Sequence, residues 1–137
     1  MKHFKLVLVL LSAAGAGHAA SADCDRECLR GFITQYLDAL VAHNPSALPL
    51  DSKVRFTEDS VEMHLGDGLW KDASRVRTFR QDVLDVRQGV AASEVIVEEA
   101  GSPVLLTMRL KVVDREGLPS SIRYEYHYQS GILGPRP

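Results

Sequence analysis

The chain has 137 residues, of which 45% are hydrophobic and 25% are charged, and its formal net charge is −2 at pH 7. This length suits one small domain rather than two. The charges are mixed in sign and contain no basic block, which argues against nucleic acid and against an anionic membrane surface as partners.

The N-terminal segment is expected to be a secretory signal peptide over residues 1–22. A short basic start precedes the apolar run of residues 6–11, and small residues follow it. Signal peptidase could cleave after Ala19 or after Ala22, and we favour the second position. The apolar run is shorter than the roughly 20 residues that span a membrane, so a retained anchor is the less favoured alternative. We therefore predict a periplasmic or secreted protein with one domain over residues 23–137 and no membrane attachment after cleavage.

Both cysteines of the chain, Cys24 and Cys28, follow directly after the expected cleavage site. Their spacing places them on one face of a helix. In an oxidising compartment we expect a disulfide between them, with a free pair or bridges to another chain as alternatives. No second pair of cysteines or histidines stands at ligand spacing, so we expect no zinc or other metal site.

The first predicted element is an amphipathic helix. Apolar residues recur at helical spacing from Leu29 to Val41, and acidic residues occupy the first turn. Asn44 and Pro45 end the helix after His43, and a short turn between prolines follows.

A hairpin and a second helix are predicted next. Apolar residues alternate with a period of two over residues 53–58 and 61–65, which indicates two paired strands. Gly66 and Gly68 end the hairpin. Helical spacing then returns, which predicts a second main helix over residues 70–84. The apolar residues that carry this spacing are Val76, Phe79 and Val83.

Only strands are predicted after residue 85. Runs rich in β-branched and aromatic residues at 95–98, 104–113 and 122–128 are divided by turns that contain glycine and proline. Helices followed by an antiparallel sheet, with one hairpin between the helices, indicate the α+β class.

This order of elements resembles the nuclear transport factor 2-like (SnoaL-like) superfamily. Local segments that resemble an exported branch of SnoaL-like proteins are YLDALVAHNP at residues 36–45, VRFTED at 54–59 and LGDGLW at 65–70. The resemblance implies a cone-shaped α+β barrel, in which a curved antiparallel sheet wraps around N-terminal helices and encloses an apolar pocket. It also implies a homodimer formed through the sheet. The C-terminal end departs from the usual final strand of this superfamily.

Glu58 is the candidate base of such a pocket. It shares a strand face with Phe56, a candidate ligand contact, and an apolar wall would raise the pKa of the carboxyl toward that of a useful base. The alternative is a solvated or capping glutamate at a strand end. His64 shares a face with Glu62 and is a second candidate for acid–base work, with a surface pair as the default.

Aromatic residues supply the other candidates. Trp70 either contacts a ligand at the floor of the pocket or belongs to the core at the joint between sheet and helix, and the second role is favoured. In the last strand, burying the tyrosines costs less than burying the charged residues that alternate with them. Tyr126 is then a candidate acid or hydrogen-bond donor, and Tyr124 a candidate ligand contact.

These residues lead to a ranked expectation about function. We expect a pocket for a small, partly apolar molecule and a cofactor-independent isomerase, lyase or dehydratase reaction that uses acid–base catalysis. One alternative is a non-catalytic ligand-binding or protein-interaction module with the same fold. Another is an inactive protein with an incomplete cone. Motifs of nucleotide-binding proteins, metalloproteases and serine hydrolases do not occur in the sequence.

Overall fold

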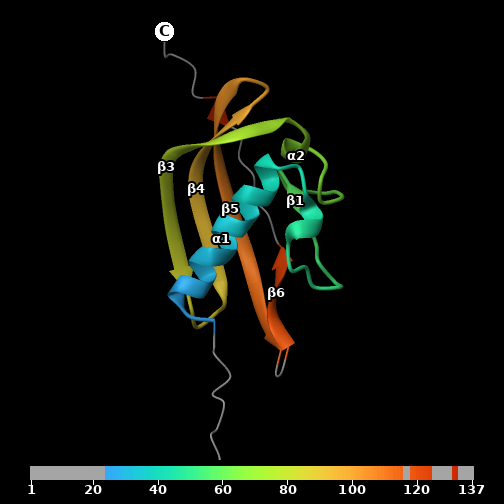
Figure 1. Cartoon of the computed structure of the whole chain (residues 1–137), viewed down its shortest axis with the longest axis vertical. Coiled ribbons are helices and arrows are strands. Elements are labelled where there is room, and N and C mark those ends of the chain that lie inside the picture. Colours follow the sequence, from blue (N-terminus) through green and yellow to red (C-terminus); the bar gives the residue numbers. More distant parts are fainter. Residues whose placement is uncertain (1–23, 116–117, 125–130, 133–137) are drawn as a thin grey trace, which may run out of the picture.

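The structure, a computed structural model, describes residues 24–115, 118–124 and 131–132. The predicted signal peptide lies outside these residues. One helix packs across one face of an antiparallel sheet of long strands, and several short elements join the two (Figure 1). The elements are α1 (Arg26–Val41), η1 (Pro45–Ala47), β1 (Thr57–Glu58), β2 (Val61–Glu62), α2 (Leu69–Asp72), β3 (Ala73–Asp85), β4 (Val90–Glu99), β5 (Ser102–Arg115), β6 (Leu118–Tyr124) and β7 (Gly131–Ile132). The predicted α+β class is confirmed.

Helix α1 forms where the apolar stripe predicts it. The side chain of Asp25 caps its first turn by accepting a hydrogen bond from the Cys28 backbone N–H at 2.9 Å. At the other end His43 takes a left-handed backbone conformation with φ of 51°, and the Asn44 N–H donates to the Ala39 carbonyl. No helix in the described part of the chain is long and apolar enough to cross a membrane.

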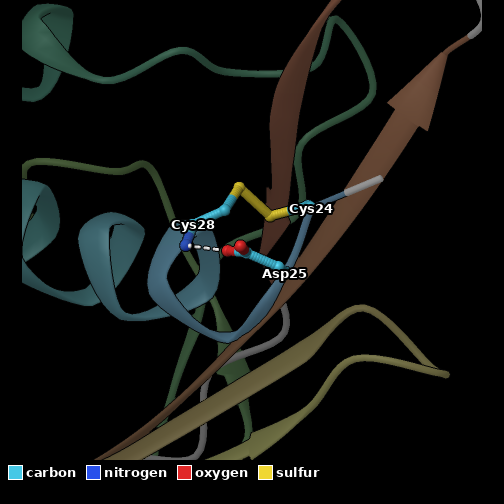
Figure 2. The surroundings of a disulfide bond; sticks show 3 residues. All are labelled: Cys24, Asp25 and Cys28. Carbon is cyan, nitrogen blue, oxygen red and sulfur yellow. Dashed lines mark hydrogen bonds between the residues drawn. A yellow bond between two sulfur atoms is a disulfide. The ribbon is translucent and has the colours of Figure 1, made fainter. Parts of the chain in front are cut away.

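The predicted disulfide is present at the start of α1. Cys24 and Cys28 are bonded, with their Cα atoms 5.2 Å apart. Figure 2 shows that the bridge spans the first helical turn next to the hydrogen bond of Asp25. Covalent and capping interactions therefore secure the same turn.

The predicted hairpin is confirmed, although its strands are shorter than expected. Thr57 pairs with Glu62, and Glu58 pairs with Val61. The two turn residues, Asp59 and Ser60, have φ values of 48° and 67°. Two consecutive residues with positive φ are the signature of a type I′ turn, whose twist matches that of the flanking strands.

The predicted second main helix is wrong. Only α2 is helical, over four residues, and the chain then runs as β3 along the edge of the sheet. The apolar residues that suggested a helix do not form a buried stripe, since Phe79 is 45% exposed and Val83 is 64% exposed. Pairing with β4 decides the conformation. A shift in register between Val76 and Arg80 adds residues to β3.

The sheet has the order β3-β4-β5-β6. The short strand β7 also pairs with β5, opposite Val104 and Leu105. The register between β4 and β5 is continuous from Val90 and Lys111 to Glu99 and Ser102. No pairing among the described strands joins β3 to β6, so the sheet is open and the predicted cone-shaped barrel is not confirmed.

The core lies between α1 and the facing side of the sheet. Apolar side chains of α1 and alternate residues of β4 and β5 belong to one buried cluster. The least exposed residues of β4 and β5 are Ala91, Val95, Val97, Leu106, Met108 and Leu110.

Candidate functional site

Glu58, the candidate base, lies at the junction of the hairpin and α2. Both of its carboxylate oxygens accept the backbone N–H of Leu69, with N···O distances of 3.2 and 3.1 Å. Gly68 makes this approach possible. Its φ of 60° and ψ of −131° suit glycine, and a Cβ atom there would collide with the Glu58 carboxylate. The side chain therefore ties the hairpin to the first turn of α2.

The surroundings of Glu58 change its acidity. Burial raises the pKa of this carboxyl above the ordinary glutamate value, and the hydrogen bond from the Leu69 N–H opposes the rise. Negative charges of Asp59 and Glu99 raise the pKa further. Glu58 therefore holds its proton to a higher pH than an exposed glutamate, as the sequence suggested, while its oxygens serve a structural contact.

Trp70 lies in the core. The side chain is 1% exposed, and its Nε1–H donates to the Tyr36 hydroxyl at 2.7 Å. The two rings meet edge to face, with centroids 5.1 Å apart and planes at 83°. The Trp70 carbonyl is hydrogen-bonded to the His43 ring. These contacts fasten α2 to the end of α1 and correspond to the core role favoured in the sequence analysis.

A hollow of about 320 Å³ lies against the hairpin, and two of the sequence-predicted residues, Phe56 and His64, line it. We call it the hairpin hollow. Its lining residues are Val54, Arg55, Phe56, Glu62, Met63, His64 and Leu65. Glu62 bonds to Arg55, with Nε and Oε2 2.9 Å apart, so the carboxylate expected beside His64 is engaged with a guanidinium.

The three candidate catalytic residues are not brought together by the described part of the chain. His64 lines the hairpin hollow, whereas Glu58 does not and is bonded to Leu69. Tyr126 lies outside the described residues. Tyr124 is described only by its backbone, which pairs with Leu110.

A polar cluster between α1 and β3 had no counterpart among the sequence predictions. The Asp82 carboxylate accepts from Arg80 Nε at 2.9 Å and from the Ser93 hydroxyl at 2.8 Å. Arg80 also donates to the Thr34 hydroxyl and to the Arg30 carbonyl on α1. Burial by itself would raise the pKa of Asp82, but the hydrogen bonds from Arg80 and Ser93 outweigh it and hold the pKa below its usual value. The cluster joins the edge strand to the helix.

Comparison with known proteins assigns no role to these residues. The chain matches no protein-family model, no curated protein and no solved structure. Within the described ranges, no group of three or more His, Cys, Asp or Glu side chains is arranged to hold a metal ion. Function is therefore inferred from the side chains of the hairpin hollow and from the environment of Glu58.

Proposed function

We propose that this protein is an exported small-molecule-binding protein whose ligand site is the hairpin hollow. The observation that carries the proposal is the composition of the wall. Phe56 and Met63 supply apolar surface, His64 supplies an imidazole, and the Arg55–Glu62 ion pair supplies charge. A volume of about 320 Å³ falls within the usual range of ligand pockets. Such a wall suits a small, partly apolar molecule with a hydrogen-bonding group.

Export and the fold family are part of the same proposal. The Cys24–Cys28 disulfide supports an oxidising compartment, in line with cleavage of a signal peptide from a periplasmic or secreted protein. A long helix lying across an antiparallel sheet supports the relation to the nuclear transport factor 2-like superfamily, with a cone-shaped pocket. Val83, an apolar side chain that is 64% exposed on edge strand β3, supports a homodimer through the sheet.

A specific observation also favours a second candidate, which is cofactor-independent acid–base catalysis. The raised pKa of Glu58 makes its carboxylate a stronger base than an exposed one. In this proposal Glu58 removes a proton from carbon in an isomerase, lyase or dehydratase reaction, and His64 or Tyr126 protonates or hydrogen-bonds the substrate oxygen. For this reaction the ligand must reach the junction of the hairpin and α2.

Ligand binding is tested by titrating the full mature chain with cyclohexanol, cyclohexanone and phenol while recording amide and imidazole NMR signals. We expect shifts concentrated in residues 54–65, and we expect His64→Ala and Met63→Ala to weaken binding by about tenfold or more. Arg87→Ala, in the exposed turn after β3, serves as the control and should bind as the wild type does. Shifts elsewhere, or equal losses in all three variants, would refute the site.

Catalysis is tested separately by following exchange of the α-protons of cyclohexanone in deuterated buffer. Glu58→Gln keeps an oxygen that can accept the Leu69 N–H, so the fold is expected to persist. If Glu58 is a base, the variant binds cyclohexanone normally but loses the protein-dependent exchange. Equal exchange in both proteins would leave binding as the function and remove the enzymatic proposal.

A further inference from the structure

The edge strand β3 contains a β-bulge between Val76 and Arg80. Val76 pairs with Val97 and Arg80 pairs with Val95, so three residues of β3 stand opposite Ile96 alone. In Figure 1, β3 starts at α2, crosses one end of the sheet and then turns to run along it. Bulges of this kind redirect side chains and are frequent beside binding sites.

Arg75, just before the bulge, and Arg77, its first residue, surround one carboxylate. Arg77 donates from Nε and Nη2 to Glu98 Oε1 at 3.0 and 2.7 Å, and Arg75 Nη2 donates to the same oxygen. The Glu98 side chain is only 15% exposed, whereas those of Arg75 and Arg77 are 65% and 45% exposed. The hydrogen bonds from Arg75 and then Arg77 hold the pKa of Glu98 below its usual value, which keeps the carboxylate ionised at neutral pH.

The charges of this group do not cancel. Two guanidinium groups and one carboxylate leave an excess of one positive charge, and each guanidinium carries five N–H donors, of which Glu98 uses one from Arg75 and two from Arg77.

A hollow of about 360 Å³ opens beside these arginines, and we call it the bulge hollow. Its lining residues are Arg75, Val76, Arg77 and Thr78. Val76, which is partly buried, is the apolar residue of this positively charged wall. The bulge hollow shares no lining residue with the hairpin hollow.

We propose that the bulge hollow binds the oxyanion group of a small molecule, a phosphate or a carboxylate, whose apolar part lies against Val76. The planar forks of Arg75 and Arg77 match the paired oxygens of such groups, and the exposed Thr78 hydroxyl is a further donor. Because both arginines are largely exposed, the interaction is screened by salt and weakens as ionic strength rises. This site is independent of the function proposed for the hairpin hollow.

Four probes separate the contributions of charge and apolar surface: phenyl phosphate, phenylacetate, inorganic phosphate and phenol. Each is titrated into the full mature chain at low salt while the amide signals of residues 75–79 are recorded by NMR. We expect phenyl phosphate or phenylacetate to bind at least about tenfold more tightly than either inorganic phosphate or phenol. The tighter of the two aromatic anions identifies the natural group as a phosphate or a carboxylate.

Variants decide whether the arginines form the site. Arg77→Gln should weaken binding of the better probe by about tenfold or more, whereas Arg87→Gln changes the net charge equally and should leave binding unchanged. Glu98→Gln removes the competing negative charge and should tighten binding severalfold. If that variant loses its fold, Arg75→Gln provides the second test and should weaken binding as Arg77→Gln does.

Several results would overturn the proposal. Shifts that avoid residues 75–79 would place the anion elsewhere. Equal losses in Arg77→Gln and Arg87→Gln would indicate attraction by net charge alone. A folded Glu98→Gln variant that binds more weakly than wild type would show that Glu98 does not compete with the anion for the arginines, and would contradict the site.

Discussion

The carboxylate of Glu58 occupies the space that a side chain at Gly68 would need. Gly68 also has a backbone conformation, with φ of 60° and ψ of −131°, that L-residues adopt only under strain. We predict that Gly68→Ala lowers the free energy of unfolding by about 1–3 kcal/mol or more, because backbone strain and displacement of the carboxylate add. Urea denaturation of the variant measures the change.

Gly31 provides the matched control. It lies inside α1, and a Cβ atom there would meet nothing within 4 Å. Gly31→Ala should therefore raise the free energy of unfolding by about 0.5–1 kcal/mol, since alanine loses less backbone entropy in a helix. A neutral or stabilising Gly68→Ala, measured beside this control, would contradict the contact with Glu58.

The hydrogen bond between Trp70 and Tyr36 makes a second prediction. Tyr36→Phe leaves the buried indole N–H without its acceptor and should cost about 1–3 kcal/mol. Trp70 is the single tryptophan of the chain, so its fluorescence reports on this contact directly. We expect native emission to resist quenching by acrylamide, because the ring is 1% exposed.

A double-mutant cycle checks that interpretation. If Trp70 and Tyr36 are coupled, Tyr36→Phe combined with Trp70→Phe costs less than the sum of the two single changes. Strict additivity, or ready quenching of the native emission, would show that the two residues are not joined as the structure has them.

Glu58 and Asp82 should affect stability in opposite directions as the pH changes. The pKa of Glu58 is raised in the folded state, so its contribution to stability is present below the ordinary glutamate pKa and is lost as pH rises through the raised value. The pKa of Asp82 is lowered, so its contribution is present above the ordinary aspartate pKa and is lost as pH falls through the lowered value.

Glu58→Gln should therefore remove a decline in the free energy of unfolding that the wild type shows above the ordinary glutamate pKa. Asp82→Asn should instead remove part of the loss at acid pH, and it also lowers stability at neutral pH by weakening the bonds to Arg80 and Ser93. Urea denaturation across the acid range gives both profiles. Parallel profiles for the two variants would contradict the assigned environments.

Reduction of the Cys24–Cys28 disulfide should have a local effect. The bridge closes a loop of only about five residues, for which chain entropy accounts for about 2 kcal/mol at most. We expect Cys24→Ser combined with Cys28→Ser to speed hydrogen exchange of amides in the first turn of α1 and to leave exchange in β4 and β5 unchanged. Asp25→Ala, which removes the cap of the same turn, should act on the same amides and cost about 1 kcal/mol.

Widespread exchange in the cysteine variant would mean that the bridge supports the whole domain. Unchanged exchange at the amides of Cys28 and Leu29 would mean that it supports neither the turn nor the fold. Either outcome would contradict the expected local effect.

Sequence patterns were a sound guide wherever one element decides its own structure. The stripe from Leu29 to Val41 requires only that a helix bury one face, and the helix is present. The long apolar runs of β4 and β5 likewise form strands, because alternate residues reach a common core. For Glu58 the sequence left two interpretations open, a base against an apolar wall and a capping group; burial raises its pKa, and its carboxylate also accepts the Leu69 N–H at the start of α2.

The failures concern residues whose conformation depends on a partner distant in sequence. The spacing of Val76, Phe79 and Val83 predicted a helix. In the structure the segment pairs with β4 and forms a strand that contains a bulge. No local pattern indicates that Trp70 donates a hydrogen bond to the Tyr36 hydroxyl or that Asp82 accepts one from Ser93. Those contacts join positions 34 and 11 residues apart.

By itself, then, the amino-acid sequence determined a first helix, two central strands, a cysteine pair on one helical turn and the α+β class, because each follows from periodicity or spacing within a short segment. Tertiary structure decided the rest. In the folded chain β3 lies at the sheet edge and Trp70 lies in the core. Glu58 accepts the Leu69 N–H, and Arg75 and Arg77 both donate to Glu98. Pairing and burial between distant segments outweigh local preference, and only the folded chain brings those segments together.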